Sequence, residues 1–330
     1  MSTPGEHLTN AEVGPGGAGF DAAATADRLA EHCRDAVRRM GRRGAVVAVS
    51  GGVDSGVTAA LCARGLGPER VMCLRLPERD THSGSTDLGL ELAQSLGAPT
   101  EEESITAALE ALGSYRRADQ AIQKVVPDYE PGWPYKLVRS APTGGVIVFS
   151  IVVETPDGSR IQRRMPSEPY RELLAASNMK QRVRKLYEYT WADQLGYAVA
   201  GTPNLLEYDQ GFFVKGGDGL ADFKPIAGLY KTEVFVLAHE LGIPEGIATR
   251  APTTDTFSLE QSQEEFYFGY PHETMDLLLW GRGEGMKPED LAPMTGLEPA
   301  DVEIAFGEID RRRTATEYLH APAVLPDRPD

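Results

Sequence analysis

A short loop carries the residues whose types and spacing point most clearly to chemistry. It reads Ala48-Val49-Ser50-Gly51-Gly52-Val53-Asp54-Ser55 and joins an apolar run to a helical pattern. Glycines let a backbone approach a phosphate closely, and the first N–H groups of a helix are free to bind one. The two serine hydroxyls add further donors. The sequence therefore predicts an anion-binding loop at a helix N-terminus.

Asp54 indicates which anion this loop would bind. A carboxylate repels a phosphate unless a cation lies between them, and Mg²⁺ is the usual cation beside nucleotide phosphates. The sequence has no GxxxxGK[ST], so it lacks the lysine that such a loop places on the β- and γ-phosphates. The loop thus predicts a magnesium–nucleotide site and disfavours transfer of a γ-phosphate.

A second group of charged residues lies between positions 201 and 232. Glu207 could bind Mg²⁺ together with Asp54. Lys231 begins an amphipathic helical pattern, from which it could direct its charge at phosphates, and Asp218 lies in a glycine-flanked turn. Each of these residues, taken alone, is more often a solvated side chain or part of a turn. On their own, these residues leave the function of this group open.

Alternating strand and helix patterns would position these residues. In chain order they fall at residues 26–40 (helix), 45–49 (strand), 57–63 (helix), 71–76 (strand), 86–96 (helix), 170–195 (helix), 197–200 (strand), 262–280 (helix) and 298–313 (helix). The alternation predicts an α/β fold, with a doubly wound parallel sheet and helices on both of its faces. Arg75, at the carboxyl end of the second strand, lies where such sheets bind nucleotides.

One block interrupts this alternation. The β-like runs 146–154 and 160–165 flank Pro156-Asp157-Gly158-Ser159, a strong turn sequence. They predict a β-hairpin inserted into the α/β core at about residues 135–168. The insertion could cap the site, form an interface or change which substrate is accepted, and a passive elaboration is also open. Residues 1–20 have no periodicity and predict a flexible leader, which leaves residues 21–330 as a single domain.

Composition limits the partners and the location of the protein. A net charge of −16 over 330 residues repels nucleic acids and anionic membranes, so we expect neither as a partner. No apolar stretch is long enough to cross a membrane and no secretion signal is visible, which predicts a cytoplasmic protein. Cys33, Cys62 and Cys73 lack metal-binding spacing and lie in apolar segments, so we expect buried free thiols.

Several separated motifs resemble those of a known family. The loop SGGVDS at residues 50–55 resembles the PP-loop of N-type ATP pyrophosphatases, which share an adenine nucleotide alpha-hydrolase-like fold. GTPNLLE at 201–207, KGGDGLAD at 215–222 and PIAGLYKT at 225–232 resemble motifs of the ammonia-dependent NAD synthetase family. NMKQRVR at 178–184 resembles that family's N-x-K-x-R-x-R helix start. The likeness covers roughly residues 25–110 and 170–280.

The resemblance implies roles for individual residues. Catalytic roles fall to Asp54, Lys231 and Asp218, of which Asp218 would bind or deprotonate ammonium beside the activated carboxyl carbon. Mg²⁺ would be held by Asp54 and Glu207. ATP would bind to residues 48–55 and to Arg75, Thr202, Lys231 and Thr253, and the dinucleotide to Arg182, Lys215, Asp222 and His320. His320 stands where related synthetases usually carry a His-Lys or Lys-Arg pair.

The resemblance also implies a reaction. ATP would activate the carboxylate of nicotinic acid adenine dinucleotide (deamido-NAD) as an adenylate with release of pyrophosphate, and ammonia would then displace AMP to give NAD⁺. A homodimer with the dinucleotide site at its interface is implied as well. The chain encodes no glutaminase, so free ammonia or a separate glutaminase partner would supply the nitrogen.

Three other functions stay open at this point. An amide ligase of the same fold could act on another carboxylate, which the inserted hairpin and the altered C-terminal stretch favour. A nucleotide-binding regulator without catalysis would not need Asp54, Glu207, Asp218 and Lys231. A tRNA thiolase is disfavoured by the absence of a cysteine pair and by the acidic charge.

Overall fold

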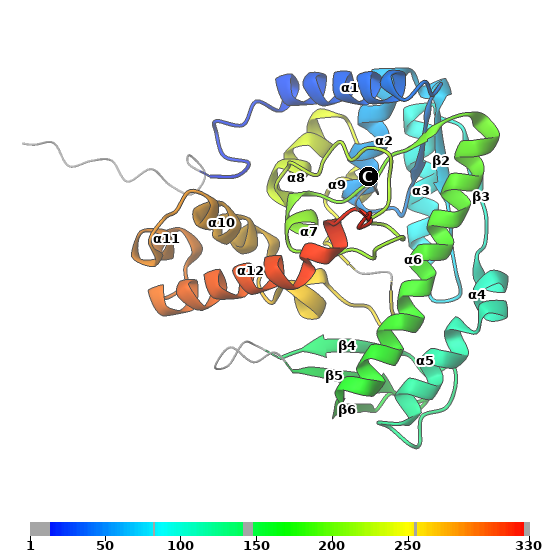
Figure 1. Cartoon of the computed structure of the whole chain (residues 1–330), viewed down its shortest axis with the longest axis vertical. Helices are drawn as coiled ribbons and strands as arrows, with labels where there is room; N and C mark the ends of the chain where they lie inside the picture. Colours follow the sequence, from blue (N-terminus) through cyan, green and yellow to red (C-terminus); the bar gives the residue numbers. More distant parts are fainter. Residues whose placement is uncertain (1–13, 82, 141–147, 254–255, 327–330) are drawn as a thin grey trace, which may run out of the picture.

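A four-stranded parallel sheet forms the centre of the protein in the computed structural model, which describes residues 14–81, 83–140, 148–253 and 256–326 (Figure 1). In the order in which they pair, its strands are β3 (Thr100–Glu102), β2 (Val71–Arg75), β1 (Ala45–Ala48) and β7 (Ala198–Val199). β1 and β2 consist almost entirely of buried residues, as expected of strands covered on both faces. The strands expected at 45–49, 71–76 and 197–200 are confirmed.

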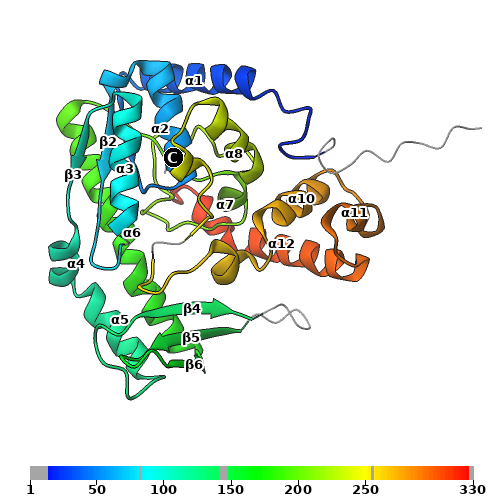
Figure 2. The ribbon, with the colours of Figure 1, turned by 180° about the vertical axis from the view of Figure 1, so that it is seen from behind.

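Helices cover both faces of this sheet, as Figures 1 and 2 show from opposite sides. One face carries α1 (Ala22–Arg39), α2 (Val53–Leu66), α3 (Ser83–Leu96), α8 (Lys231–Glu240) and the short α9 (Glu245–Ala248). The other carries α4 (Thr106–Leu112) and α6 (Ser167–Leu195). Side chains alternate between the two layers, since Val47 packs under α2 whereas Val46 packs under α6. The predicted doubly wound α/β fold is confirmed. Cys33, Cys62 and Cys73 are buried free thiols, as predicted.

The helix α6 is the longest helix among the described residues and includes the motif NMKQRVR. It begins at Ser167, after Pro166 in an extended conformation, so the helix expected over 170–195 is confirmed and the motif from Asn178 lies inside it. Pro169 lies in the first turn, where a missing N–H costs nothing. As a result α6 runs from the inserted sheet along one face of the core and carries residues to both (Figure 1).

The insertion is a three-stranded antiparallel sheet. β4 (Tyr135–Arg139), β5 (Phe149–Glu154) and β6 (Arg160–Arg164) pair in that order and pack on α5 (Ser114–Gln123) and α6. The hairpin of β5 and β6 is confirmed; the part of the run 146–154 before residue 148 lies outside the described residues. The third strand, β4, was not predicted. It lies next to a loop rich in proline and glycine, which hid its short alternating pattern.

Residues 264–320 form a helical lobe beside the core (Figure 1). It contains the π-helical turn Glu264–Phe268, α10 (His272–Gly283), α11 (Pro288–Thr295) and α12 (Pro299–His320). The prediction of one helix over 262–280 is wrong, because Gly269 adopts a φ of +82° and Pro271 follows it. Among the described residues, no helix is both long and apolar enough to span a bilayer.

Candidate active site

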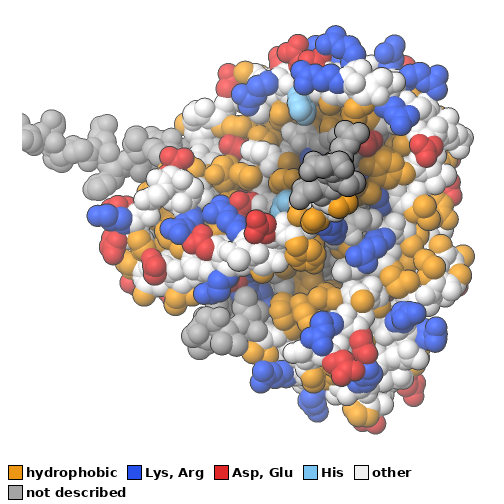
Figure 3. Space-filling view, in the orientation of Figure 1, with side chains coloured by type: hydrophobic (Ala, Val, Ile, Leu, Met, Phe, Trp, Pro, Cys, Tyr) orange, Lys and Arg blue, Asp and Glu red, His pale blue; other side chains and the backbone are white. Residues whose placement is uncertain are grey.

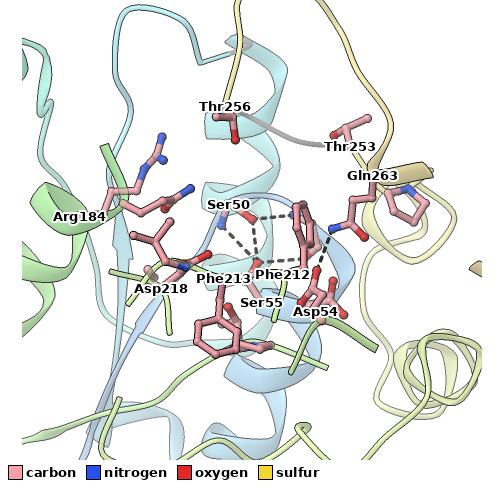
Figure 4. A pocket seen from close by; sticks show the side chains of 18 of the residues that line it. Ser50, Asp54, Ser55, Arg184, Phe212, Phe213, Asp218, Thr253, Thr256 and Gln263 are labelled. Carbon is pink, nitrogen blue, oxygen red and sulfur yellow. Dashed lines mark hydrogen bonds between the residues drawn. The ribbon is translucent and has the colours of Figure 1, made fainter. Parts of the chain in front are cut away.

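A cavity of about 430 Å³ opens at the carboxyl ends of β1 and β2. This is where doubly wound sheets bind nucleotides. Most of the predicted nucleotide and metal residues line it: Ala48, Val49, Ser50, Gly52, Val53, Asp54, Ser55, Arg75, Thr202, Glu207, Asp218, Lys231 and Thr253. Residues that are far apart in the sequence thus converge on one hollow, which is shown from close by in Figure 4.

The loop between β1 and α2 has the geometry of an anion site. Gly52 precedes α2 and provides no side-chain cap, so the first N–H groups of the helix are available to a ligand. Ser55 Oγ donates to the Gly52 carbonyl (2.9 Å) and accepts from Ser50 N (3.2 Å), which closes the loop on itself. Gly51 has a structural role, and its predicted contact with ATP stays a prediction. Its φ is +75°, and a Cβ there would lie 2.5 Å from the Ser85 carbonyl oxygen, so it is required for the close approach of α3 and does not line the cavity.

Asn204 joins the two predicted metal carboxylates. Its Nδ2 donates to Asp54 Oδ1 at 3.0 Å. It also caps α7 (Leu205–Asp209), where its Oδ1 accepts from Glu207 N at 3.0 Å and its own N–H donates to Glu207 Oε2 at 3.3 Å. Sequence reasoning assigned Asn204 no role. The Asn-x-x-Glu spacing of a capping box was the signal that could have revealed it.

The two carboxylates fit a divalent cation. Burial, and next the negative charge of Asp54, raise the pKa of Glu207 to about 8, although Lys231 opposes this shift. Two carboxylates so close together are stable as anions only when positive charge is nearby. No third histidine, cysteine, aspartate or glutamate joins them among the described residues. That set suits Mg²⁺, which typically takes one or two carboxylates together with substrate phosphates.

Lys231 supplies positive charge at the same place. Only 2% of its side chain is exposed, and its Nζ pairs with Asp54 Oδ2. The first turn of α8 holds it there, because Asp276 of α10 accepts from Thr232 N at 2.8 Å and Glu233 accepts from Tyr230 N at 2.9 Å. The lysine is therefore fixed beside Asp54 and the loop between β1 and α2.

Asp276 should make the stability of this helix pair depend on pH. Burial raises its pKa from 3.8 to about 7, so the folded protein holds the proton more tightly than the unfolded chain. The resulting stabilisation is complete below pH 4 and is lost as the pH rises through 7, in total about 4 kcal/mol. Asparagine does not titrate, so we expect the free energy of unfolding of Asp276→Asn, taken relative to that of the wild type, to rise by about 2 to 3 kcal/mol from pH 5 to pH 8. Urea unfolding at both pH values measures this, and an equal difference at both would contradict it.

Asp218 lies on a different wall of the cavity. In the view of Figure 4 it lies with Arg184 on one side of Ser50 and Ser55, whereas Asp54 lies on the other. Its Oδ1 accepts from Val214 N at 2.7 Å, and burial raises its pKa. A buried carboxylate of raised pKa, exposed to a cavity, is suited to accept a proton.

Two arginines of the cavity had no assigned role. Arg250 donates to the Gly51 carbonyl (3.3 Å) and to Ser85 Oγ (3.0 Å), so it ties the segment after α9 to the phosphate loop. Arg184 lines the cavity from α6, and its place in the motif NMKQRVR was the available signal. Arg250 carried no such signal. Arg75 lines the cavity as predicted, and it forms an ion pair with Glu102.

The four predicted dinucleotide residues are not in the cavity. Arg182, Lys215, Asp222 and His320 are exposed. Arg182 Nε donates to the Lys215 carbonyl (3.2 Å), and Lys215 Nζ donates to the Tyr318 and Ala321 carbonyls at the end of α12 (2.6 and 3.1 Å). Asp222 instead accepts from Val199 N at 2.7 Å. Their binding role stays a prediction.

The sheet topology and the loop define the class of protein. The loop follows the first strand of a doubly wound sheet, lacks a Walker lysine, and faces two carboxylates and a lysine. This combination is typical of the N-type ATP pyrophosphatase fold. The sequence model of the family described as NAD synthase matches residues 25–128 and 152–319, and the chain belongs to that family.

Curated proteins and solved structures agree with this assignment. An NH(3)-dependent NAD(+) synthetase of Rhizobium meliloti is 48% identical over 303 residues, which cover 91% of each chain. One from Thermotoga maritima is 33% identical over 80% of this chain and 89% of its own. The NMN synthetase of Francisella tularensis superposes with a TM-score of 0.66 at 22% identity, covering 94% of this chain and all of its own. The NH3-dependent NAD synthetase of Campylobacter jejuni gives 0.60 at 19%, covering 93% and 100%. At these identities the structures establish the fold alone.

Proposed function

We propose that this protein is an NAD⁺ synthase that amidates deamido-NAD with ammonia at the expense of ATP. The observation that supports this proposal most directly is that Asp54, Glu207 and Lys231 lie together beside the phosphate loop. The identity of 48% to a curated NH(3)-dependent NAD(+) synthetase over nine-tenths of both chains supports the substrate assignment. A Walker lysine binds the β- and γ-phosphates, so an enzyme that cleaves ATP between the α- and β-phosphates does not need one.

The first step needs charge neutralisation more than proton transfer. Asp54 and Glu207 would hold Mg²⁺, which when bound offsets the charge of the triphosphate and of the pyrophosphate that leaves. The free N–H groups at the start of α2 and the hydroxyls of Ser50 and Ser55 bind phosphate oxygens. Lys231 adds fixed positive charge next to them. The substrate carboxylate oxygen then attacks the α-phosphorus, and pyrophosphate leaves.

The second step needs a base. Asp218 binds ammonium and takes its proton, which yields ammonia next to the adenylated carboxyl group. The nitrogen lone pair attacks the carbonyl carbon, the bond from that carbon to the AMP oxygen breaks, and the amide loses a second proton to solvent. The raised pKa of Asp218 supports its role as proton acceptor.

The exposed face between α6 and α12 suits a second copy of the chain. The predicted dinucleotide residues lie there with three exposed apolar side chains, Leu186, Leu220 and Tyr318. Figure 3 shows hydrophobic side chains gathered in the middle of this face. We propose a homodimer in which this face completes the dinucleotide site.

The remaining expectations belong to the same proposal. The nitrogen comes from free ammonia or from a separate glutaminase, and the enzyme works in the cytoplasm without nucleic-acid or membrane partners. Residues 21–330 form one domain, with residues 1–20 as a leader and the insertion at about 135–168.

Product analysis tests the function directly. Incubation with Mg-ATP, ammonium and deamido-NAD should give NAD⁺ and AMP in equal amounts, measured by mass spectrometry. A parallel reaction with nicotinic acid mononucleotide is the control, because an enzyme named NMN synthetase shares the fold. Amidation of the mononucleotide alone would identify a ligase for a different carboxylate. Binding of ATP without turnover of either substrate would favour a regulator.

A further inference from the structure

The inserted sheet includes a stretch outside the family pattern. The match to the NAD synthase family breaks off at residue 128 and resumes at 152, so β4 and the first half of β5 fall in the unmatched part. One described side chain of that part, Phe149, lines the cavity. The unmatched stretch therefore contributes little to the cavity directly, and its main contacts are with another segment of the chain.

The outer edge of β4 is bonded to the segment 256–268. Tyr135 N donates to Ser258 Oγ (2.9 Å), and the Tyr135 carbonyl accepts from Leu259 N (3.1 Å). Further along the strand, the buried Gln261 donates its Nε2 to the Leu137 carbonyl. The segment thereby covers what would otherwise be an exposed strand edge.

Charged side chains of β4 reinforce these bonds. Lys136 Nζ pairs with Glu265 at 2.8 Å and also donates to the Glu260 carbonyl at 3.3 Å. Arg139, 2% exposed, donates to the Tyr267 carbonyl at 2.6 Å. Four residues of this short strand, at positions 135, 136, 137 and 139, therefore hold the segment at points between Ser258 and Tyr267.

This segment carries part of the active site. Thr256, Gln263, Phe266 and Tyr267 line the cavity. Gln263 Nε2 donates to Glu207 Oε1 at 2.8 Å, and Figure 4 shows Gln263 on the side of the cavity where Asp54 lies. The other carboxylate oxygen of Glu207 accepts a hydrogen bond from Asn204 N, so both oxygens are hydrogen-bonded.

The segment has little regular structure that could hold it in place by itself. It contains a single π-helical turn, Glu264–Phe268, a form found often at functional sites. On the core side Lys180 Nζ donates to the Thr256 carbonyl at 3.0 Å. At Gln263 the backbone N–H donates to the Pro252 carbonyl (3.3 Å), and near the end of the segment the Tyr267 hydroxyl donates to the Gln210 carbonyl (2.8 Å) and Arg312 to the Tyr267 carbonyl (2.8 Å). Between Ser258 and Gln261 the bonds run to β4, and irregular segments without such bonds move readily.

We propose that the inserted sheet is a scaffold that positions Gln263 against Glu207, and so fixes the orientation of the carboxylate intended for the metal. Gln263 and the sheet are positioning elements and touch no reacting atom. This proposal rests on one part of the proposed function, namely that Glu207 helps to hold Mg²⁺. Groups that orient a metal ligand typically change metal affinity by about 10- to 100-fold when they are removed.

Three variants test the scaffold. Gln263→Met removes the donor but keeps the length of the side chain, and Lys136→Met removes one link from β4 to the segment. Arg160→Ala is the matched control, because it removes an exposed ion pair with Glu154 on the far strands of the same sheet. Calorimetry would measure binding of an ATP analogue with a methylene α–β bridge, with and without Mg²⁺. Hydrogen–deuterium exchange of residues 256–268 would be followed without metal or nucleotide.

We expect Gln263→Met to weaken binding of the magnesium complex about 10-fold or more while metal-free binding stays unchanged. Lys136→Met should show a smaller loss of the same kind and faster exchange in 256–268, and Arg160→Ala should match the wild type. Wild-type affinity in Gln263→Met, or unchanged exchange in Lys136→Met, would overturn the proposal. These readouts do not involve the carboxylate substrate, so failure to form NAD⁺ with this pattern intact would refute the proposed substrate and not the scaffold.

Discussion

Asp54→Asn should lower the rate of pyrophosphate release about 1000-fold and leave the protein folded. The asparagine keeps an oxygen that can accept from Asn204, but it removes the negative charge that faces Lys231 and would hold Mg²⁺. A coupled pyrophosphate assay measures the rate, and circular dichroism checks the fold.

The control for this variant is Asp310→Asn. Asp310 pairs with Arg282 at 2.5 Å on the exposed surface of the helical lobe, so its replacement removes an ion pair but touches no part of the cavity. We expect wild-type turnover from it. If Asp54→Asn kept turnover within about tenfold of the wild type, its assignment to the metal would be wrong.

Asp218→Asn should separate the two steps of the reaction. The amide can still accept the bond from Val214 N, so the turn should keep its shape, but it cannot take a proton from ammonium. Loss of a general base typically costs 10²- to 10⁴-fold, and we expect about 1000-fold slower formation of NAD⁺. Exchange of labelled pyrophosphate into ATP, which reports adenylate formation, should stay near the wild-type rate. An equal fall of both rates would show that Asp218 acts in binding or folding instead.

The phosphate site was predictable because its parts are local. A buried strand, a glycine turn and a helix start lie within one short stretch, so the position of Asp54 at the start of α2 followed from the order of residues. Glu207 and Lys231 were predicted to join Asp54 mainly from the resemblance to the family, because their neighbouring residues do not predict a contact with a distant segment. Both line the cavity. The structure adds Asn204 as the residue that joins both carboxylates.

What was missed depends on contacts between distant segments. Gln263 and Arg250 reach Glu207 and Gly51 only because the chain after α9 folds back over the cavity. β4 was hidden because a short strand at a sheet edge is defined by its partners more than by its own pattern. The helix expected over 262–280 fails at Gly269, where a left-handed backbone outweighs the helical periodicity around it.

The central claim is that this cavity activates a carboxylate by joining it to AMP. The most direct test uses deamido-NAD labelled with ¹⁸O in its carboxylate, with Mg-ATP and ammonium, and locates the label by mass spectrometry. Adenylation predicts that a single labelled oxygen appears in AMP and none in pyrophosphate. Label in inorganic phosphate, with ADP as the other product, would show attack at the γ-phosphate and contradict the account.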